Sequence, residues 1–274
     1  MDIIIQMMSY PFIVRAFIVG ILVSLCAALL GVSLVLKQYS MIGDGLSHVS
    51  YGALSIAVAC GIAPLKVSIP VVVLAAFLLL RMTENGVMKS DAAIAAMSAS
   101  ALAVGVTVTA LTTGMTTDVC SYMFGSILAM STDDVILSVV LSIIVLILFV
   151  FCYHSIFAVT FDESFAKATG VKVSFFNSMI AILTAITIVL GMQMMGAMQM
   201  MGAMLISSLI IFPALSSMRL FKSFKSVMIS SGILSVVCFC IGMIISYMYS
   251  TPAGASVVLV NLAVFIVFLI LERI

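Results

Sequence analysis

Apolar residues fill long blocks along almost the whole chain, and short polar stretches separate these blocks. An apolar block of about 18 residues or more is long enough to cross a bilayer as a helix. The expected spans are residues 12–36, 46–62, 67–82, 92–111, 135–158, 173–191, 193–217, 227–249 and 254–271. The pattern therefore predicts an all-α membrane protein, a polytopic helical bundle of nine transmembrane helices.

Composition agrees with this fold class. The 274 residues are 65 % hydrophobic and 8 % charged, with a mean hydropathy of +1.41, which excludes a soluble domain. No polar segment is long enough to fold separately, so we expect residues 1–274 to form a single transmembrane domain. The net charge of +1 gives no reason to expect a nucleic-acid partner, and the six scattered cysteines are interpreted as small apolar side chains.

The basic residues predict how the bundle lies in the membrane. Lysine and arginine are enriched in cytoplasmic loops. One side of the predicted bundle carries Lys37, Arg81, Lys89, Lys167, Lys172, Arg219, Lys222, Lys225 and Arg273. The other side carries Arg15 and Lys66. We therefore expect the N-terminus outside and the C-terminus in the cytoplasm.

Two titratable residues, Asp44 and His48, stand at the start of the second block, where residues 41–52 read MIGDGLSHVSYG. Such groups beside hydrocarbon are costly unless they are paired, hydrated or liganded. Residues four apart share one face of a helix, and a carboxylate and an imidazole one turn apart suit Zn²⁺ or Mn²⁺. The alternative is that Asp44 caps the helix and His48 hydrogen-bonds to a neighbouring helix.

Two ligands do not complete a metal site. A two-fold homodimer would bring together two carboxylates and two imidazoles, enough for four-coordinate binding. The fourth block, residues 92–111, is rich in Ala, Ser and Gly, which let membrane helices approach closely.

A charged segment on the predicted cytoplasmic side, residues 161–172, has the pattern of a short capped helix. Asp162 is placed to cap it, Glu163 to pair with Lys167 four residues on, and Gly170 to end it. One side of this helix is apolar, so it either docks a partner protein or lies on the lipid surface.

The chain has no means of hydrolysing a nucleotide by the P-loop route, because it contains no G-x-x-x-x-G-K-[ST]. It also lacks the chain of carboxylates within spans that is typical of a proton-driven carrier. Both observations favour an external ATPase over ion coupling.

A methionine-rich repeat occupies residues 191–204, which read GMQMMGAMQMMGAM. Thioethers suit Cu(I), but methionine is also a common apolar filler, and we favour the second interpretation. Six extra residues would turn a helix by about 240° and lengthen it by about 9 Å. We therefore expect the repeat to lie in a loop or to distort the seventh span.

Five longer motifs stand out along the chain: GDGLSHVSYGAL at 43–54, SYMFGSILAMSTDDV at 121–135, TFDESFAKATGV at 160–171, GAMLISSLIIFPALSS at 202–217 and TPAGASVVLV at 251–260. Together they resemble one family over nearly the whole chain, the integral-membrane permeases of metal-ion ABC importers of the zinc and manganese type (the ABC-3 family). The doubled GAMQMM departs from the single copy expected in this family.

The resemblance implies a homodimeric permease in a bacterial cell membrane, similar in fold to the type II vitamin B12 and siderophore importers. It implies cytoplasmic ATPase subunits, an extracytoplasmic metal-binding protein, and Asp44 and His48 on the path of the transported metal. It also implies that residues 161–171 form the coupling helix. The residues assigned to ATPase coupling are Asp162, Glu163, Ala166, Lys167 and Gly170. The chain would itself be no enzyme and would hold no permanent cofactor.

The expected cargo is zinc, with manganese or iron as the alternatives for the same permease family. A secondary transporter driven by an ion gradient would need no ATPase. A siderophore or cobalamin permease would share the architecture without needing Asp44 and His48 as ligands.

Overall fold

The computed structural model of the chain describes Met7, residues 9–62, 64–84, Gly86, and residues 88–112, 132–194 and 199–272. Every regular element in these ranges is a helix. The helices are α2 (Pro11–Leu36), α3 (Ile42–Ala59), α4 (Pro64–Glu84), α5 (Ser90–Leu111), α7 (Thr132–Phe151), α8 (Tyr153–Phe161), α9 (Glu163–Ala168), α10 (Val173–Met194), α11 (Gln199–Leu220), α12 (Phe224–Tyr249) and α13 (Ala253–Leu271). The expected all-α membrane fold is therefore confirmed.

Five of the described helices are long and apolar enough to cross a membrane, namely α2, α5, α10, α12 and α13, and the bent pair α7–α8 adds a sixth. Two further stretches, Val67–Thr83 in α4 and Met204–Leu220 in α11, are also apolar and helical but shorter than these spans. Helix α3 has 18 residues and includes Asp44 and His48. The count of nine spans stays a prediction.

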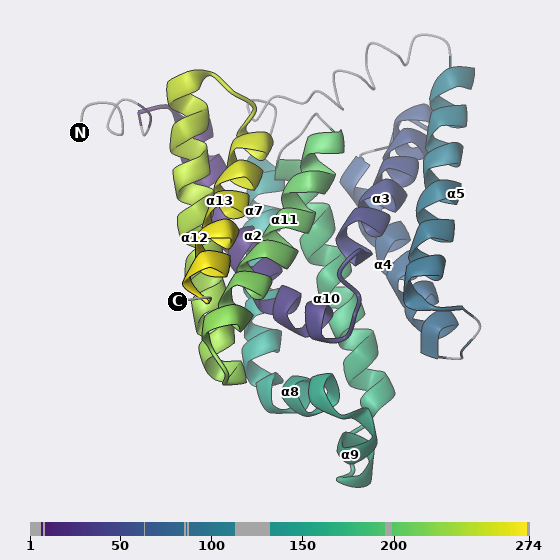
Figure 1. Cartoon of the computed structure of the whole chain (residues 1–274). Coiled ribbons are helices and arrows are strands. Elements are labelled where there is room, and N and C mark those ends of the chain that lie inside the picture. Colours follow the sequence, from purple (N-terminus) through teal and green to yellow (C-terminus); the bar gives the residue numbers. More distant parts are fainter. Residues whose placement is uncertain are drawn as a thin grey trace.

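Helix α2 is the centre of the bundle and contacts α7, α10, α11 and α12. Of its apolar span, 67 % is buried, against 11 % for α5. Figure 1 places α3, α4 and α5 at one side of the bundle and α12 and α13 at the other. The core side chains, among them Leu30, Leu46 and Ile206, come from several helices. Helix α5 is thus a peripheral helix whose contacts are mainly with α3.

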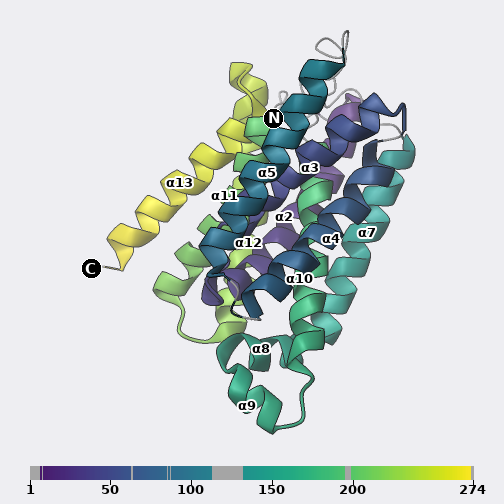
Figure 2. The ribbon, with the colours of Figure 1, turned by 90° about the vertical axis from the view of Figure 1, so that its right-hand side faces the viewer.

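The fifth apolar block, expected as a span over residues 135–158, is divided into two helices by a sharp bend. Helix α7 ends at Phe151, and α8 leaves it at an angle of 70°. The rings of Tyr153, Phe157 and Phe161 on α8 pack around Phe224 at the start of α12, with centroid distances of 5.0–5.7 Å. These apolar residues are partly covered by other parts of the protein. Hydropathy alone does not show whether an apolar residue contacts protein or lipid. Helices α8 and α9 lie at one end of the bundle in both views (Figures 1 and 2).

The methionine-rich repeat, residues 191–204, includes the last residues of α10, which ends at Met194, and the first residues of α11, which begins at Gln199. The expectation that the repeat lies in a loop or distorts the seventh span depends on residues outside the described part of the chain, so it stays a prediction. Residues 195–198, the side chains of residues 199–203 and residues 121–131 of the second motif lie outside the described part of the chain.

Candidate functional site

Helix α3 begins four residues earlier than expected, at Ile42, and its N-cap is Met41, which makes no side-chain cap hydrogen bond. The backbone N–H of Gly45 donates to the carbonyl oxygen of Met41, over 3.1 Å, so the first turn is already helical. Asp44 therefore lies inside the helix, and its interpretation as an N-cap is wrong.

Asp44 and His48 form a pair one turn apart on α3. The Nε2 atom of His48 lies 3.7 Å from Oδ2 of Asp44, and their side chains are 29 % and 43 % exposed, respectively. Their neighbours Gly43, Gly45, Leu46 and Ser47 are buried. The carboxylate and the imidazole thus share the accessible face of an otherwise packed helical segment.

Glycines on either side of Asp44 let two other helices approach this segment closely. A Cβ on Gly45 would lie 2.6 Å from Cγ2 of Ile94 on α5, and one on Gly43 would lie 3.2 Å from Oγ of Ser207 on α11. Successive helical residues point about 100° apart. The side chain of Asp44 therefore points between the directions of α5 and α11.

The pair is incomplete as a metal site in a single chain. Across the described residues, no group of three or more His, Cys, Asp or Glu side chains lies close enough to hold a metal ion. One oxygen and one nitrogen ligand are half of a tetrahedral set. Further ligands have to come from a second chain, from water or from residues outside the described part.

The predicted capped helix at 161–172 is present as α9. Oδ1 of Asp162 accepts a hydrogen bond from the backbone N–H of Phe165, over 2.9 Å, which confirms the N-cap. At the other end Gly170 has φ +86°, and the N–H of Val171 donates to the carbonyl of Ala166, over 2.9 Å. These bonds form a Schellman motif, which confirms that Gly170 ends the helix.

Glu163 makes a different ion pair from the one expected. Its Oε1 lies 2.7 Å from Nζ of Lys37, at the end of α2, instead of pairing with Lys167. The same oxygen accepts a hydrogen bond from Nδ2 of Asn177 on α10 over 3.1 Å, and Lys37 Nζ also donates to Oδ1 of Asn177. The side chain of Lys37 is only 10 % exposed, so its ammonium group requires these partners, whereas Lys167 is exposed to solvent.

This arrangement shifts the titration of Glu163. Partial burial raises the pKa of its carboxyl group, but the hydrogen bonds from Lys37 and Asn177 and the charge of Lys37 lower it, and the net pKa is below the ordinary value of 4.5. Glu163 is therefore ionised at neutral pH. Its carboxylate ties α9 to two transmembrane helices.

The residues of α9 divide into buried and exposed positions. The side chain of Ala166 is fully buried within this chain, while Phe165 and the preceding Phe161 are 64 % and 59 % exposed. Asp162, Lys167 and Gly170 are also exposed. A protein that docks on α9 would contact the two phenylalanines. Ala166 would act indirectly, by packing α9 against the rest of the chain.

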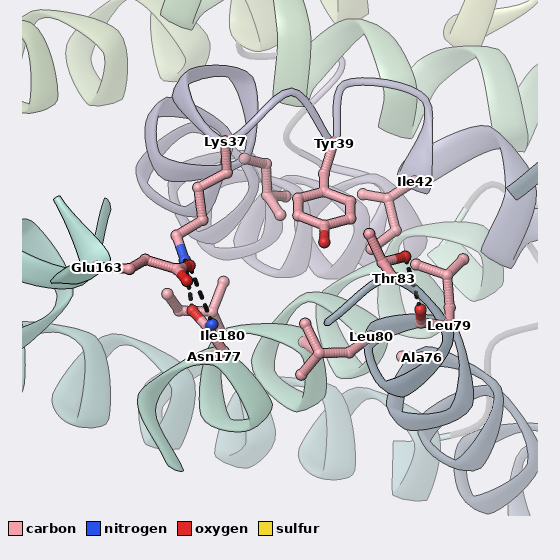
Figure 3. A pocket seen from close by; sticks show the side chains of 12 residues that line it. Lys37, Tyr39, Ile42, Ala76, Leu79, Leu80, Thr83, Glu163, Asn177 and Ile180 are labelled. Carbon is pink, nitrogen blue, oxygen red and sulfur yellow. Dashed lines mark hydrogen bonds and ion pairs between the residues drawn. The ribbon is translucent and has the colours of Figure 1, made fainter. Parts of the chain in front are cut away.

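A cavity of about 310 Å³ adjoins this network. Figure 3 shows Lys37, Glu163 and Asn177 at one side of it and Tyr39 and Ile42 between them and α4. Most of the remaining lining is apolar and comes from Leu34, Ala76, Leu79, Leu80, Ile180 and Ala181.

Sequence reasoning missed Lys37 and Asn177 as functional candidates. Lys37 was used only to orient the bundle. The available signal was a lysine directly after a long apolar block and an asparagine within another, but nothing local indicates that these two residues meet.

The chain is similar to known membrane transport proteins. The family model described as "ABC 3 transport family" matches residues 9–272. The manganese import system permease protein ScaB of Streptococcus gordonii is 28 % identical over 94 % of this chain and 91 % of its own length. The high-affinity zinc uptake system membrane protein ZnuB of Haemophilus influenzae is 28 % identical over 93 % of this chain and 95 % of its own length.

A solved structure has the same fold. PsaBC from Streptococcus pneumoniae, in complex with a Fab, superposes with a TM-score of 0.82 at 26 % identity. The match covers 97 % of this chain and 94 % of that one.

Proposed function

The chain belongs to the ABC 3 transport family and, with its manganese and zinc permease relatives, is a non-enzymatic membrane permease subunit for metal transport, and on this premise we propose that its cargo is Zn²⁺. The observation that carries the proposal is the partly exposed Asp44–His48 pair on α3. Imidazole ligands suit zinc, whereas manganese prefers carboxylate, carbonyl and water oxygens. Manganese and iron are the alternative cargoes for the same family, and iron also accepts imidazole ligands.

The permease acts as a two-fold homodimer in this proposal, because each chain supplies only half of a four-coordinate set. Helix α5 is the surface through which two chains meet, beside the Asp44–His48 pair. It is the most exposed of the long apolar helices. Its outer face carries exposed alanines at regular helical spacing, Ala92, Ala96, Ala99, Ala103 and Ala110, and such small residues permit close helix packing in membranes.

The end of the bundle that carries α9 faces the cytoplasm. The contact of Lys37 with Glu163 and of Phe224 with Phe161 brings the end of α2 and the start of α12 to this end. Basic residues on or beside these elements are Lys37, Lys167, Lys172, Lys222 and Lys225. Their gathering supports a cytoplasmic location by the positive-inside rule, with the start of α2 outside.

The energy comes from two cytoplasmic ATPase subunits that dock on α9. The exposed rings of Phe161 and Phe165 are the apolar contacts, and Asp162 and Gly170 hold the helix in shape for docking. An extracytoplasmic metal-binding protein delivers the ion at the opposite end of the bundle. Closure of the ATPases moves α9 and reverses access to the site, which binds the ion weakly enough to release it.

Metal accumulation in cells tests the proposal. A bacterial strain without its own zinc and manganese importers would express this chain with its ATPase and binding protein, in medium depleted of each metal in turn. We expect the cellular zinc content to recover and the manganese content to stay low. Recovery of the cellular manganese content alone would show that the cargo is manganese. Uptake by the chain alone in liposomes, driven by an ion gradient, would contradict an ATP-driven mechanism.

A further inference from the structure

We propose that Lys37 is a positioning residue that transmits the movement of α9 to the first turn of α3, and so to Asp44 and His48. The inference rests on the proposed function and deepens it, because it names the internal contact through which a docked ATPase reaches the metal path. Three features carry it: a polar network, a short hydrogen-bonded turn and a cavity.

The network joins three helices at one point. Lys37 at the end of α2, Glu163 at the start of α9 and Asn177 near the start of α10 are mutually bonded. The pair Lys37–Glu163 bridges 126 positions of sequence. Because Glu163 is the first residue of α9, a displacement of that helix acts directly on the Lys37 ammonium group.

The turn between α2 and α3 is short and contains several backbone hydrogen bonds. Gln38 has φ +62°, its N–H donates to the carbonyl of Val35, and the N–H of Tyr39 donates to the carbonyl of Leu34. The N–H of Ile42, the first residue of α3, donates in turn to the carbonyl of Tyr39, over 3.0 Å. Lys37 is therefore joined to the first residue of α3 by a short turn that begins with a Schellman motif, through which a displacement of Lys37 reaches α3.

The cavity provides space for this corner to move. Lys37, Tyr39 and Ile42 line it from the α2–α3 side, and the rest of its lining includes Thr83 of α4 and Ile180 of α10 (Figure 3). Close-packed interiors resist displacement, and a void of about 310 Å³ beside the turn removes that resistance on one side. Asp44 follows Ile42 by two residues, so a shift of the turn changes the position of the ligand pair.

Cysteine labelling at the ligand helix tests the link directly. A His48→Cys permease would be assembled with its ATPase and binding protein in proteoliposomes, and a maleimide would be added with and without vanadate-trapped nucleotide. Peptide mass spectrometry separates position 48 from the native cysteines. With Lys37 present, we expect the labelling rates in the two states to differ by at least about fivefold, the lower end of usual allosteric couplings.

Lys37→Met keeps a side chain of similar length and removes the charge. In this variant the labelling difference should fall below about twofold, while the ATPase co-purifies and hydrolyses ATP as before. The exchange K37E/E163K should restore the difference. Lys172→Met, an exposed lysine at the same end of the bundle, is the matched control and should leave the difference intact.

A full labelling difference in Lys37→Met, or no difference when Lys37 is present, would overturn the inference. Loss of the ATPase from the Lys37→Met complex would also overturn it, because the residue would then act in docking. If Lys37→Met is not recovered from membranes, Glu163→Gln takes its place with the same expected loss. If labelling depends on nucleotide but the wild-type complex takes up no zinc, the proposed cargo would be contradicted. The role of Lys37 between α9 and α3 would still be supported.

Discussion

The Oδ2 atom of Asp44 lies 3.7 Å from Nε2 of His48, one helical turn away on the same partly exposed face of α3. This separation is longer than a hydrogen bond, so the two groups do not satisfy each other. An ion between two such ligands would be bound by both, since metal–oxygen and metal–nitrogen bonds of zinc are about 2.0–2.2 Å long.

Asp44→Ala and His48→Ala are each expected to lower the initial rate of zinc uptake at least about tenfold. Even the loss of a residue that only hydrogen-bonds to a metal ligand lowers metal affinity or activity by about 10–100-fold. Uptake of radioactive zinc into cells measures this effect. The other histidine of the chain, His154 on α8, gives the matched control, and His154→Ala should stay within about twofold of wild type. Equal uptake by all three variants would exclude the pair from the metal path.

Phe165→Asp should release the ATPase without destabilising the permease, because the ring is 64 % exposed and available to a partner. Loss of a central aromatic contact weakens an interface by about 2 kcal/mol, or about thirtyfold in affinity. Co-purification of the tagged ATPase measures it. Ser164→Ala, also exposed on α9, should retain the ATPase.

Ala166→Leu should also weaken ATPase binding, for a different reason. Ala166 is fully buried, so a larger side chain has to push α9 away from the rest of the chain, at a cost of about 1–3 kcal/mol. A lower melting temperature of the isolated permease should accompany the loss. A variant that loses the ATPase at an unchanged melting temperature would place Ala166 in direct contact with the partner.

Gly52→Ala should separate α3 from α5. A Cβ at this position would lie 2.8 Å from the carbonyl oxygen of Ala101, a backbone atom that cannot rotate away. We expect a loss of about 1–3 kcal/mol in stability, measured by thermal unfolding in detergent. Gly232→Ala is the control, because its Cβ would meet only the flexible side chains of Leu25 and Leu29, the nearer at 3.0 Å. Equal effects of the two substitutions would contradict a close α3–α5 contact.

Protonation of Glu163 in acid should lower the stability of the permease, because it removes the ion pair with Lys37. Its pKa in the folded chain is lowered below 4.5 by Lys37 and Asn177, so its stabilising contribution is present above the unfolded pKa and is lost as the pH falls through the folded value. The melting temperature of the wild type should therefore exceed that of Glu163→Gln at pH 6, and the difference should shrink below pH 4.5. A difference that is constant with pH would contradict the ion pair.

Cysteines on α5 test the homodimer. Ala103→Cys, on the outer face of the helix, should give a disulfide-linked dimer in oxidised membranes, because two copies of α5 meet at the two-fold axis. Val150→Cys, 67 % exposed on α7, should remain monomeric on a denaturing gel. Crosslinking at position 150 but not at 103 would place the subunit contact elsewhere.

Local patterns were sufficient for much of the molecule. The ends of α2, α5, α12 and α13 match the apolar blocks within a few residues, because a helix in lipid has to satisfy its own backbone hydrogen bonds. The capping of α9 by Asp162 and its termination at Gly170 were also predictable, since both depend on bonds within one short segment. The early start of α3 was not, because Asp44 between two glycines is equally compatible with a cap and with a packed helical turn.

The sequence by itself determined the membrane class, the family and the pairing of Asp44 with His48, since each depends on hydropathy, motif or spacing within a few turns. Only the tertiary structure decided that α8 turns away from α7, that Ala166 is buried and that Glu163 bonds Lys37 instead of Lys167. These outcomes depend on which helices pack together. A half-exposed carboxylate pairs with the cation that packing brings nearest, and that cation lies 126 positions away.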